Sequence, residues 1–263
     1  MAALAYADRL TAFFEQLHSG STRILLLDYD GTLAPFRIER DLAFPYPEIP
    51  RLLSQIIASG TRVVLISGRP AQQLARLSGI HPQPEIWGSH GLERLRPEGS
   101  YQVEPLSLER QAGLREASEF LRSQGLESHM ELKPGGVALH WRGLASQDVE
   151  KLKSKVQKVW RELAGRSSLE LLDFDGGLEI RVRGKDKGNA VAAILRESNA
   201  DAVIAYLGDD RTDEDAFRVL RGRGLTALVR DEFRPTLADI QLRPPQDVIR
   251  FLEDWLLASG QKD

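Results

Sequence analysis

A pair of aspartates separated by one residue follows an apolar segment near the start of the chain. Asp28 and Asp30 lie in the sequence Asp28-Tyr29-Asp30-Gly31-Thr32, directly after Ile24–Leu27. Side chains at positions i and i+2 leave a strand end in the same direction. Two carboxylates this close repel each other, so they need a cation or a shared proton. An acidic turn bent at Gly31 is the alternative that this pentapeptide alone leaves open.

Three further polar segments carry groups that suit a phosphate. Ser67-Gly68-Arg69 follows an apolar run, and a serine hydroxyl beside a helix N-terminus can bind phosphate oxygens. Lys187-Gly188 opens an expected helix, and Gly208–Asp215 holds five carboxylates in seven residues. Taken singly, the three segments would be interpreted as a serine in a turn, a lysine on the surface and an acidic cap of a helix. Five carboxylates exceed what capping needs, and hard oxygen ligands suit Mg²⁺. Together, the four segments indicate a site for phosphoryl transfer.

The elements that must position these groups form an α/β pattern. Ile24–Leu27, Val63–Ile66 and Val203–Leu207 read as strands buried on both faces. Helical patterns lie between them, at Ile49–Ser59, Pro70–Leu77 and Gly188–Ser198. This alternation predicts a doubly wound parallel sheet, and ligands bind such a sheet at the carboxyl ends of its strands.

The middle of the chain has a different pattern. Two amphipathic helices are expected at Leu108–Gln124 and Ser146–Leu163, with alternating segments at Ser128–Trp141 and Leu169–Arg181, the latter read as one strand. A helix, strands, a helix and a strand suggest a small α+β module with an antiparallel sheet. We therefore expect a core formed by residues 1–105 and 184–263, with an inserted α+β cap at residues 106–183.

The four polar segments resemble the four motifs of the haloacid dehalogenase (HAD) superfamily. A narrower set resembles the trehalose-6-phosphate phosphatase family of that superfamily, in order between residues 27 and 217. The segments that carry this resemblance are Leu27–Pro35, Ile66–Arg69, Gly88–Glu93, Glu131–Lys133, His140–Arg142, Glu179–Arg181, Lys187-Gly188 and Gly208–Glu214. The chain departs from the family pattern at Trp141, at Val182 and in Arg230–Pro235, which lacks an expected glycine-containing turn.

The resemblance implies roles for the residues of the core. Asp28 would be the nucleophile that forms an aspartyl-phosphate, and Asp30 the general acid and base. Ser67 and Lys187 would bind the phosphate oxygens. Mg²⁺ would be held by Asp28, by the backbone carbonyl of Asp30 and by Asp209. For two further acids, Asp210 and Asp213, the open roles are binding the metal through water, supporting its ligands or holding Lys187.

The resemblance also implies that the cap selects the substrate, because a phosphate alone does not distinguish one sugar from another. The residues expected to read the sugar hydroxyls are Glu131, Lys133, His140 and Arg142, with Arg69, His90 and Glu179 where core and cap meet. For Glu179, the open roles are contact with the sugar and holding the two domains together. Without the resemblance, Glu131 and Lys133 would read as solvated strand charges, and His140 as a packed histidine.

The resulting expectation is a Mg²⁺-dependent phosphatase of trehalose biosynthesis that acts on trehalose 6-phosphate. Two alternatives remain. One is a related HAD phosphatase acting on glucosyl- or mannosyl-phosphoglycerate or on sucrose phosphate. The other is a non-catalytic regulatory subunit of trehalose synthesis. A P-type ATPase fragment is disfavoured, because the second acid, Asp30, allows hydrolysis and no membrane helices are predicted.

Composition limits the remaining classes. The chain has 263 residues, a net charge of −3 and no cysteine. It therefore fits one large or two modest domains, lacks the basic excess of a general nucleic-acid or membrane binder, and has no thiolate chemistry. Asp8 and Arg9 interrupt the apolar N-terminal stretch, which predicts an amphipathic helix rather than a signal peptide. We expect a cytoplasmic protein whose partner is a sugar phosphate, with the trehalose-6-phosphate synthase that supplies it on a separate chain.

Overall fold

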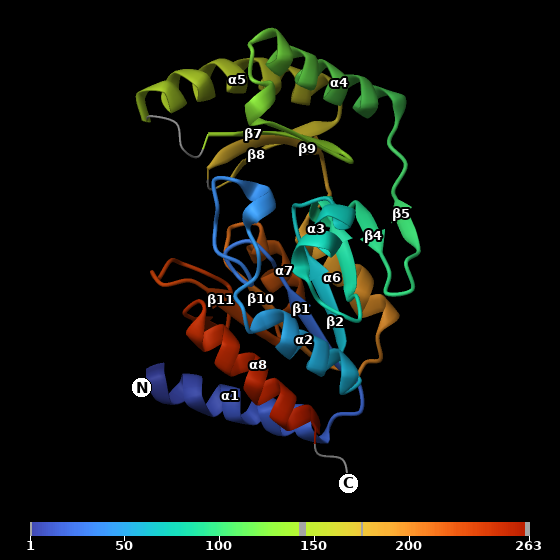
Figure 1. Cartoon of the computed structure of the whole chain (residues 1–263), viewed down its shortest axis with the longest axis vertical. Helices are drawn as coiled ribbons and strands as arrows, with labels where there is room; N and C mark the ends of the chain where they lie inside the picture. Colours follow the sequence, from blue (N-terminus) through green and yellow to red (C-terminus); the bar gives the residue numbers. More distant parts are fainter. Residues whose placement is uncertain (1, 142–145, 175, 261–263) are drawn as a thin grey trace. The chain divides into compact units, whose positions relative to one another are not determined.

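The computed structural model describes residues 2–141, 146–174 and 176–260 (Figure 1). The chain divides into two compact units, one formed by Met1–Tyr101 with Asp186–Asp263 and the other by Gln102–Lys185. β5 (Tyr101–Val103) lies where the chain passes from the first unit to the second.

The first unit is built on a mainly parallel sheet with the strand order β12-β11-β10-β1-β2-β3-β4-β5. From β12 to β3 all neighbours pair in parallel, whereas β3 and β4 are antiparallel. The strands are β1 (Arg23–Leu27), β2 (Arg62–Ile66), β3 (Glu85–Gly88), β4 (Glu93–Leu95), β10 (Val203–Gly208), β11 (Leu225–Val229) and β12 (Ile240–Leu242). The short apolar segments therefore form the centre of this sheet, as their sequence predicts.

Helices cover both faces of this sheet, because alternate side chains of each strand point to opposite faces. Leu25 and Leu27 pack with α1 (Ala2–Ser19), α2 (Ile49–Ala58), α3 (Ala71–Ser78) and α8 (Gln246–Gly260). Ile24 and Leu26 pack with α6 (Lys187–Glu197) and α7 (Asp213–Leu220). The sheet is thus a buried middle layer, and its strand ends are held in place from both sides.

The second unit is an antiparallel sheet covered on one face by two helices (Figure 1). Its strands have the order β6-β7-β9-β8, with bounds β6 (Met130–Lys133), β7 (Gly136–His140), β8 (Leu169–Phe174) and β9 (Gly177–Val182). The helices α4 (Leu108–Ser123) and α5 (Ser146–Arg166) pack on this sheet through a core that includes Leu121, Trp160 and Ile180.

The α/β class predicted from the sequence is confirmed, with one correction of detail. Leu169–Arg181 was expected to be one strand, but β8 and β9 form an antiparallel pair there, in which Leu171 faces Ile180. Gly177 pairs with Phe174 close to the turn, and a Cβ at Gly177 would overlap the Phe174 ring. The apolar alternation runs through both strands and hides the turn between them.

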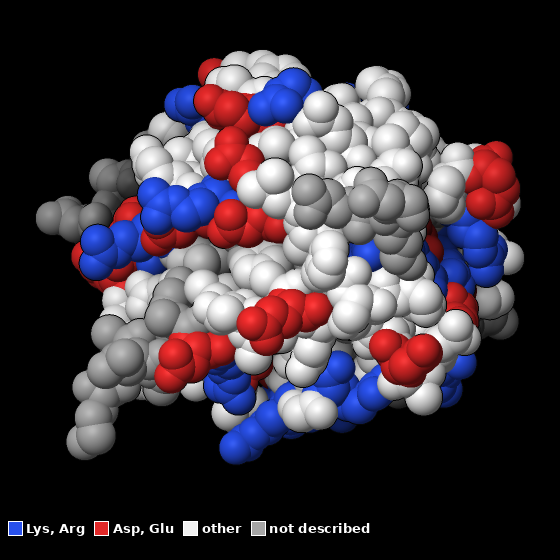
Figure 2. All heavy atoms as spheres, turned by 90° about the horizontal axis from the view of Figure 1, so that it is seen from below, with Lys and Arg blue, Asp and Glu red and all other residues white. Residues whose placement is uncertain are grey.

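No helix in the described part of the chain is long and apolar enough to cross a bilayer. On the face drawn in Figure 2, basic and acidic side chains are interspersed rather than gathered into one large patch of a single sign.

Candidate active site

The polar segments meet at the carboxyl edge of the parallel sheet, because the strands that precede them are neighbours. Leu27 at the end of β1 pairs with Leu207 of β10 on one side and with Leu65 of β2 on the other. Asp28 continues this arrangement, since its backbone N–H donates to the Leu207 carbonyl at 2.9 Å. Asp28, Ser67 and Asp209 therefore follow three adjacent strands.

Lys187 brings two of the acidic groups together. Its Nζ lies 2.6 Å from Asp28 Oδ1 and 2.8 Å from Asp213 Oδ1. Asp186 caps the first turn of α6 by accepting from the Asn189 backbone N–H at 2.8 Å, which fixes the backbone from which the lysine projects. Tyr206 also donates its hydroxyl to Asp213 Oδ1, at 2.5 Å. The lysine side chain is only 3% exposed, so this is a buried network rather than a surface ion pair.

Burial sets the protonation behaviour of this network. It raises the pKa of Asp28 to about 7, although the Lys187 ammonium opposes the shift. Burial and the neighbouring carboxylates of Asp28 and Asp213 also raise the pKa of Asp209 well above its ordinary value. Burial alone would lower the pKa of Lys187, but the attraction of Asp213 and Asp28 outweighs it and raises this pKa. Full ionisation of these three carboxyl groups would place more negative charge here than one lysine offsets, so the ionised cluster would favour a further cation.

Asp30 has a cation of its own. Its two carboxylate oxygens accept from Arg69 Nε and Nη2, each at 2.7 Å, in a bidentate ion pair. Asp28 and Asp30, which are separated by a single residue, therefore pair with different cations. Asp28 pairs with Lys187, and Asp30 pairs with Arg69. Arg69, which the family resemblance assigns to the substrate, is here a partner of the proposed acid.

Ser67, directly after β2, is hydrogen-bonded to His90, which lies in the tight turn after β3. The Ser67 carbonyl accepts from the His90 N–H at 3.0 Å, and Ser67 Oγ accepts from the Arg69 N–H at 3.2 Å. His90 has a left-handed backbone with φ 57°, and a Cβ at Gly68 would come 2.8 Å from its ring. Glycine at position 68 thus lets the histidine ring approach the backbone beside Ser67.

Glu93 supports this turn, although the sequence indicated only that it belongs to a motif. Its side chain is buried and accepts from the Ser89 hydroxyl and from Tyr101 OH, the latter at 2.7 Å. Ser89 also has a left-handed backbone, with φ 46°. The carboxylate therefore stabilises a backbone conformation that serine and histidine adopt at a cost.

Two glycines make room for the acidic side chains. Gly31 has φ 81°, and a Cβ there would overlap the Asp209 carboxylate. A Cβ at Gly208 would overlap the Asp213 carboxylate in the same way. The glycines of both acidic segments are thus required by the close approach of a carboxylate.

The site has the donor set of a hard divalent cation. One carboxylate oxygen from each of Asp28, Asp209 and Asp213 lies within 4.8 Å of the others, and all three residues are buried. Asp213 differs from the other two because its Oδ1 contacts Lys187 and Tyr206, and its Oδ2 accepts from the Asp210 N–H at 3.0 Å. Asp28 and Asp209 therefore fit a metal better than Asp213 does. Asp210 Oδ1 accepts from the Arg211 N–H at 2.7 Å, within the acidic turn.

The predicted substrate residues of the second unit share one face of its sheet. Glu131 of β6 lies opposite Ala138 of β7, and Ala138 lies opposite Glu179 of β9. The alternate residues of β7 and β9 point to the other face and pack toward α4 and α5. Lys133 Nζ lies 3.1 Å from Glu179 and 3.8 Å from Glu131. His140 Nε2 lies 2.9 Å from Glu131 Oε2. The structure thus brings these four side chains into one network opposite the helices.

The surroundings of this network include residues that the sequence did not single out as binding residues. Arg142 lies outside the described residues. Phe174 packs against the His140 ring with centroids 5.2 Å apart, and Lys153 lies over the Trp141 ring at 5.7 Å. Arg181 Nε donates to Glu170 at 2.9 Å on the same sheet face. In β9, Glu179 and Arg181 alternate with apolar residues, and this alternation was the signal for the pair.

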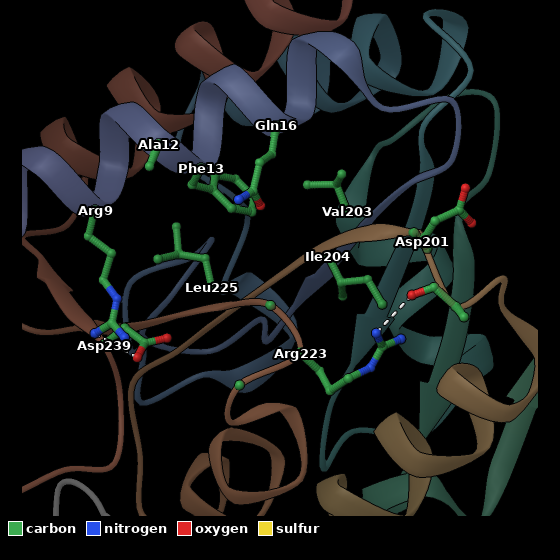
Figure 3. Close-up of a pocket in the computed structure, with 14 residues that line it drawn as sticks. Arg9, Ala12, Phe13, Gln16, Asp201, Val203, Ile204, Arg223, Leu225 and Asp239 are labelled. Carbon is green, nitrogen blue, oxygen red and sulfur yellow. Dashed lines mark hydrogen bonds and ion pairs between the residues drawn. The ribbon is translucent and has the colours of Figure 1, made fainter.

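A separate cavity of about 400 Å³ opens at the opposite, amino-terminal edge of the parallel sheet (Figure 3). It lies between α1 and the starts of β10 and β11, where Phe13, Val203 and Leu225 line it. Arg9 on its rim pairs with Asp239 at 2.9 Å, and Arg223 donates to the Ala200 carbonyl at 2.8 Å. None of the predicted catalytic residues lines this cavity, so we place the chemistry at the carboxyl edge.

The chain is similar in sequence and in fold to trehalose-phosphate phosphatases. The family model for trehalose-phosphatase matches residues 26–239. A "probable trehalose-phosphate phosphatase C" of Arabidopsis thaliana is 30% identical over 266 residues, covering 91% of this chain and 79% of the relative. The solved C-terminal domain of a trehalose-6-phosphate phosphatase from C. albicans superposes with a TM-score of 0.79 at 19% identity, covering 96% of this chain and 97% of that one.

The fold alone does not separate an enzyme from a regulatory domain. The C-terminal domain of a Candida albicans trehalose synthase regulatory protein also superposes, with a TM-score of 0.72 at 15% identity, covering 92% of this chain and 97% of that one. Any assignment of activity must therefore rest on the sequence family and on the residues of the site.

Proposed function

Since the chain belongs to the trehalose-phosphatase family of phosphatases, we propose that it hydrolyses trehalose 6-phosphate to trehalose and phosphate, with Mg²⁺ and through an aspartyl-phosphate. The observation that carries this proposal is the buried contact of 2.6 Å between Asp28 and Lys187, beside Asp209. It combines a nucleophile, a phosphate-binding cation and a metal ligand at the carboxyl edge of one sheet.

In the first step, an Asp28 carboxylate oxygen attacks phosphorus while the bond from phosphorus to the sugar oxygen breaks. Asp30 donates a proton to the departing oxygen. In the second step, Asp30 takes a proton from water as the water attacks phosphorus, and the bond to Asp28 breaks. Lys187 and Ser67 bind the non-bridging oxygens, whose charge is spread in the transition state. Because Arg69 holds both oxygens of Asp30, this ion pair must open for proton transfer.

The residues present fit Mg²⁺, as the buried oxygen ligands and the mutual repulsion of the neighbouring carboxylates indicate. Asp28, Asp209 and the Asp30 carbonyl are the ligands that we propose, and a metal bound there would offset the negative charge of the phosphate. Asp213 is better suited to hold Lys187, since it contacts both the lysine and Tyr206.

The second unit is proposed to select the sugar. Glu131, Lys133, His140 and Glu179 offer both donors and acceptors on one sheet face, which suits a disaccharide with many hydroxyl groups. Gly136 lies close to the Glu179 side chain, and a Cβ at this glycine would come 2.6 Å from Glu179 Oε1. This glycine therefore leaves room for the glutamate to turn toward Lys133.

Replacing Glu131 tests the assignment of the second unit. Glu131→Ala should raise KM for trehalose 6-phosphate by roughly 10- to 150-fold, since a lost hydrogen bond to a charged group is worth about 1.5–3 kcal/mol. Hydrolysis of a small aryl phosphate should stay within about twofold of wild type, because that substrate has no sugar to bind. Steady-state kinetics on both substrates measure the two effects.

Glu116→Ala is the matched control, since Glu116 is an exposed residue of α4 in the same unit that pairs with Arg166. We expect wild-type values for it on both substrates. An equal loss on both substrates for Glu131→Ala would point to misfolding and count against a role in sugar recognition.

The activity itself is tested by phosphate release from purified protein with Mg²⁺. Trehalose 6-phosphate should be strongly preferred over sucrose 6-phosphate, glucosyl-3-phosphoglycerate and glucose 6-phosphate, and EDTA should remove the activity. Equal and slow release from all four would retain the phosphatase and reject the proposed specificity. No release from a folded protein that binds Mg²⁺ would support the regulatory alternative.

The proposed substrate also implies a supplier. A sugar phosphate of this kind must come from a glycosyltransferase that joins two sugars, one of them phosphorylated. We propose that a trehalose-6-phosphate synthase on another chain performs that reaction.

A further inference from the structure

The loop between β11 and β12 sends one arginine to the backbone of the acidic turn. Arg234 Nη2 donates to the Asp210 carbonyl at 2.9 Å and lies 3.4 Å from the Asp209 carbonyl. Its Nη1 donates to the Pro235 carbonyl at 3.1 Å and also pairs with Glu214. The arginine side chain is 18% exposed, so these contacts are largely shielded from water.

This turn has to place the Asp209 carboxylate accurately. Asp209 follows β10 directly, and the space at Gly31 shows how closely its carboxylate is packed. The backbone of the next residue, Asp210, is held from two sides, since Asp213 accepts from its N–H at 3.0 Å and Arg234 donates to its carbonyl. The turn that carries Asp209 is therefore fixed between a buried carboxylate and a guanidinium.

The charge of Arg234 is balanced where it lies. Glu214 pairs with the arginine and also accepts from Thr236 Oγ1 and from the Leu237 N–H, each at 2.8 Å. The arginine and its glutamate thus form a locally neutral brace between the β11–β12 loop and the first turn of α7. Its effect on the site should come from geometry rather than from added positive charge.

We propose that Arg234 is a positioning residue for the metal site, which fixes the acidic turn so that Asp209 can bind Mg²⁺. The inference rests on the proposed function, because it assigns Asp209 to the metal.

Arg234→Lys is the principal test. Lysine keeps the charge but cannot bind two carbonyls and a carboxylate with one planar group. We expect it to weaken Mg²⁺ binding by about 10-fold, the lower end of what is typical for groups that orient metal ligands. KM for trehalose 6-phosphate at saturating Mg²⁺ should stay within about twofold. Titration calorimetry of the full chain with MgCl₂ alone measures the first quantity, and amide hydrogen exchange at residues 209–213 in EDTA should become faster.

Arg218→Lys is the matched control, because Arg218 also pairs with an acid of α7, Asp215 at 2.7 Å, but its side chain is 63% exposed. Its Mg²⁺ affinity should equal that of wild type. Arg234→Met, which removes all donors and keeps the aliphatic stem, provides a second variant and should bind Mg²⁺ at least as weakly as Arg234→Lys.

Three results separate this inference from the proposed function. Wild-type Mg²⁺ affinity in both Arg234 variants would overturn the inference and leave the proposed function standing. A lower unfolding temperature in EDTA with unchanged Mg²⁺ affinity would also overturn it, because Arg234 would then only stabilise the fold. A wild-type chain that neither binds Mg²⁺ nor releases phosphate would instead reject the proposed function.

Discussion

Asp28→Asn should reduce phosphate release from trehalose 6-phosphate by about 10⁴-fold or more, the scale on which removal of a nucleophile acts in enzymes that form covalent intermediates. The amide has nearly the shape of the carboxylate but cannot form the acyl phosphate. No labelled protein should appear when the variant is quenched during turnover of ³²P-labelled substrate, whereas wild type should carry the label.

The variant should remain folded, which makes the loss of activity interpretable. Burial raises the pKa of Asp28 to about 7, so a neutral side chain is tolerated at this position. Lys187 keeps Asp213 as a partner at 2.8 Å. We therefore expect an unfolding temperature in EDTA no lower than that of wild type.

Asp215→Asn is the matched control for this substitution. Asp215 is an acid of α7 with a half-exposed side chain that pairs with Arg218. Turnover of this variant should stay within about twofold of wild type. Residual activity of Asp28→Asn above about 1% of wild type would reject the nucleophile assignment, provided that mass spectrometry excludes deamidation of the introduced side chain.

The sequence predicts which backbone positions meet, but not which side chains pair. Short apolar strands followed by polar turns place Asp28, Ser67 and Asp209 at one sheet edge, and adjacent β10, β1 and β2 provide that arrangement. The pairing of Asp30 with Arg69 joins residues 39 positions apart and depends on how two turns fold. No periodic pattern records such a contact.

Tyr206 illustrates a second limit. It lies in an apolar strand, and by its neighbours Ala205 and Leu207 it reads as a core residue. Its ring does pack in the core, 5.7 Å from Phe217, while its hydroxyl reaches Asp213. A residue with an apolar body and a polar tip serves both environments, and its position in the strand indicates only the first. The strand β12 was not predicted, because three residues carry little periodic signal. The strand β11 was also missed, although it is as long as β1 and equally apolar.

Lys187→Met should destabilise the protein by about 3–5 kcal/mol in EDTA, because removal of one partner leaves buried carboxylates without their cation. Lys187 contacts Asp28 and Asp213, and Asp209 completes the acidic cluster. Methionine fills nearly the same volume, so little of the loss should come from a cavity. Urea denaturation at pH 7 measures the free energy of unfolding.

Lys185→Met provides the matched control two residues away. Lys185 pairs with Glu104 at 2.5 Å, with its side chain 27% exposed and that of the glutamate 48% exposed. Exposed pairs of this kind contribute about 0–1 kcal/mol, so this variant should unfold close to wild type. A loss for Lys187→Met no larger than that for Lys185→Met would show that the cluster is not charged in the folded protein.

The pH dependence of the stability that Lys187→Met loses distinguishes an electrostatic cause from a packing cause. Without the ammonium, the pKa of Asp28 should rise above its value of about 7 in wild type, because burial is then opposed by one cation fewer. A folded-state pKa above the unfolded value means that ionisation costs stability as the pH rises. The loss should therefore be larger at pH 8 than at pH 5, where Asp28 is protonated and repels its neighbours less. If the loss of stability is the same at pH 5 and at pH 8, it comes from packing. Lys187 would then not be the group that keeps the proposed nucleophile ionised.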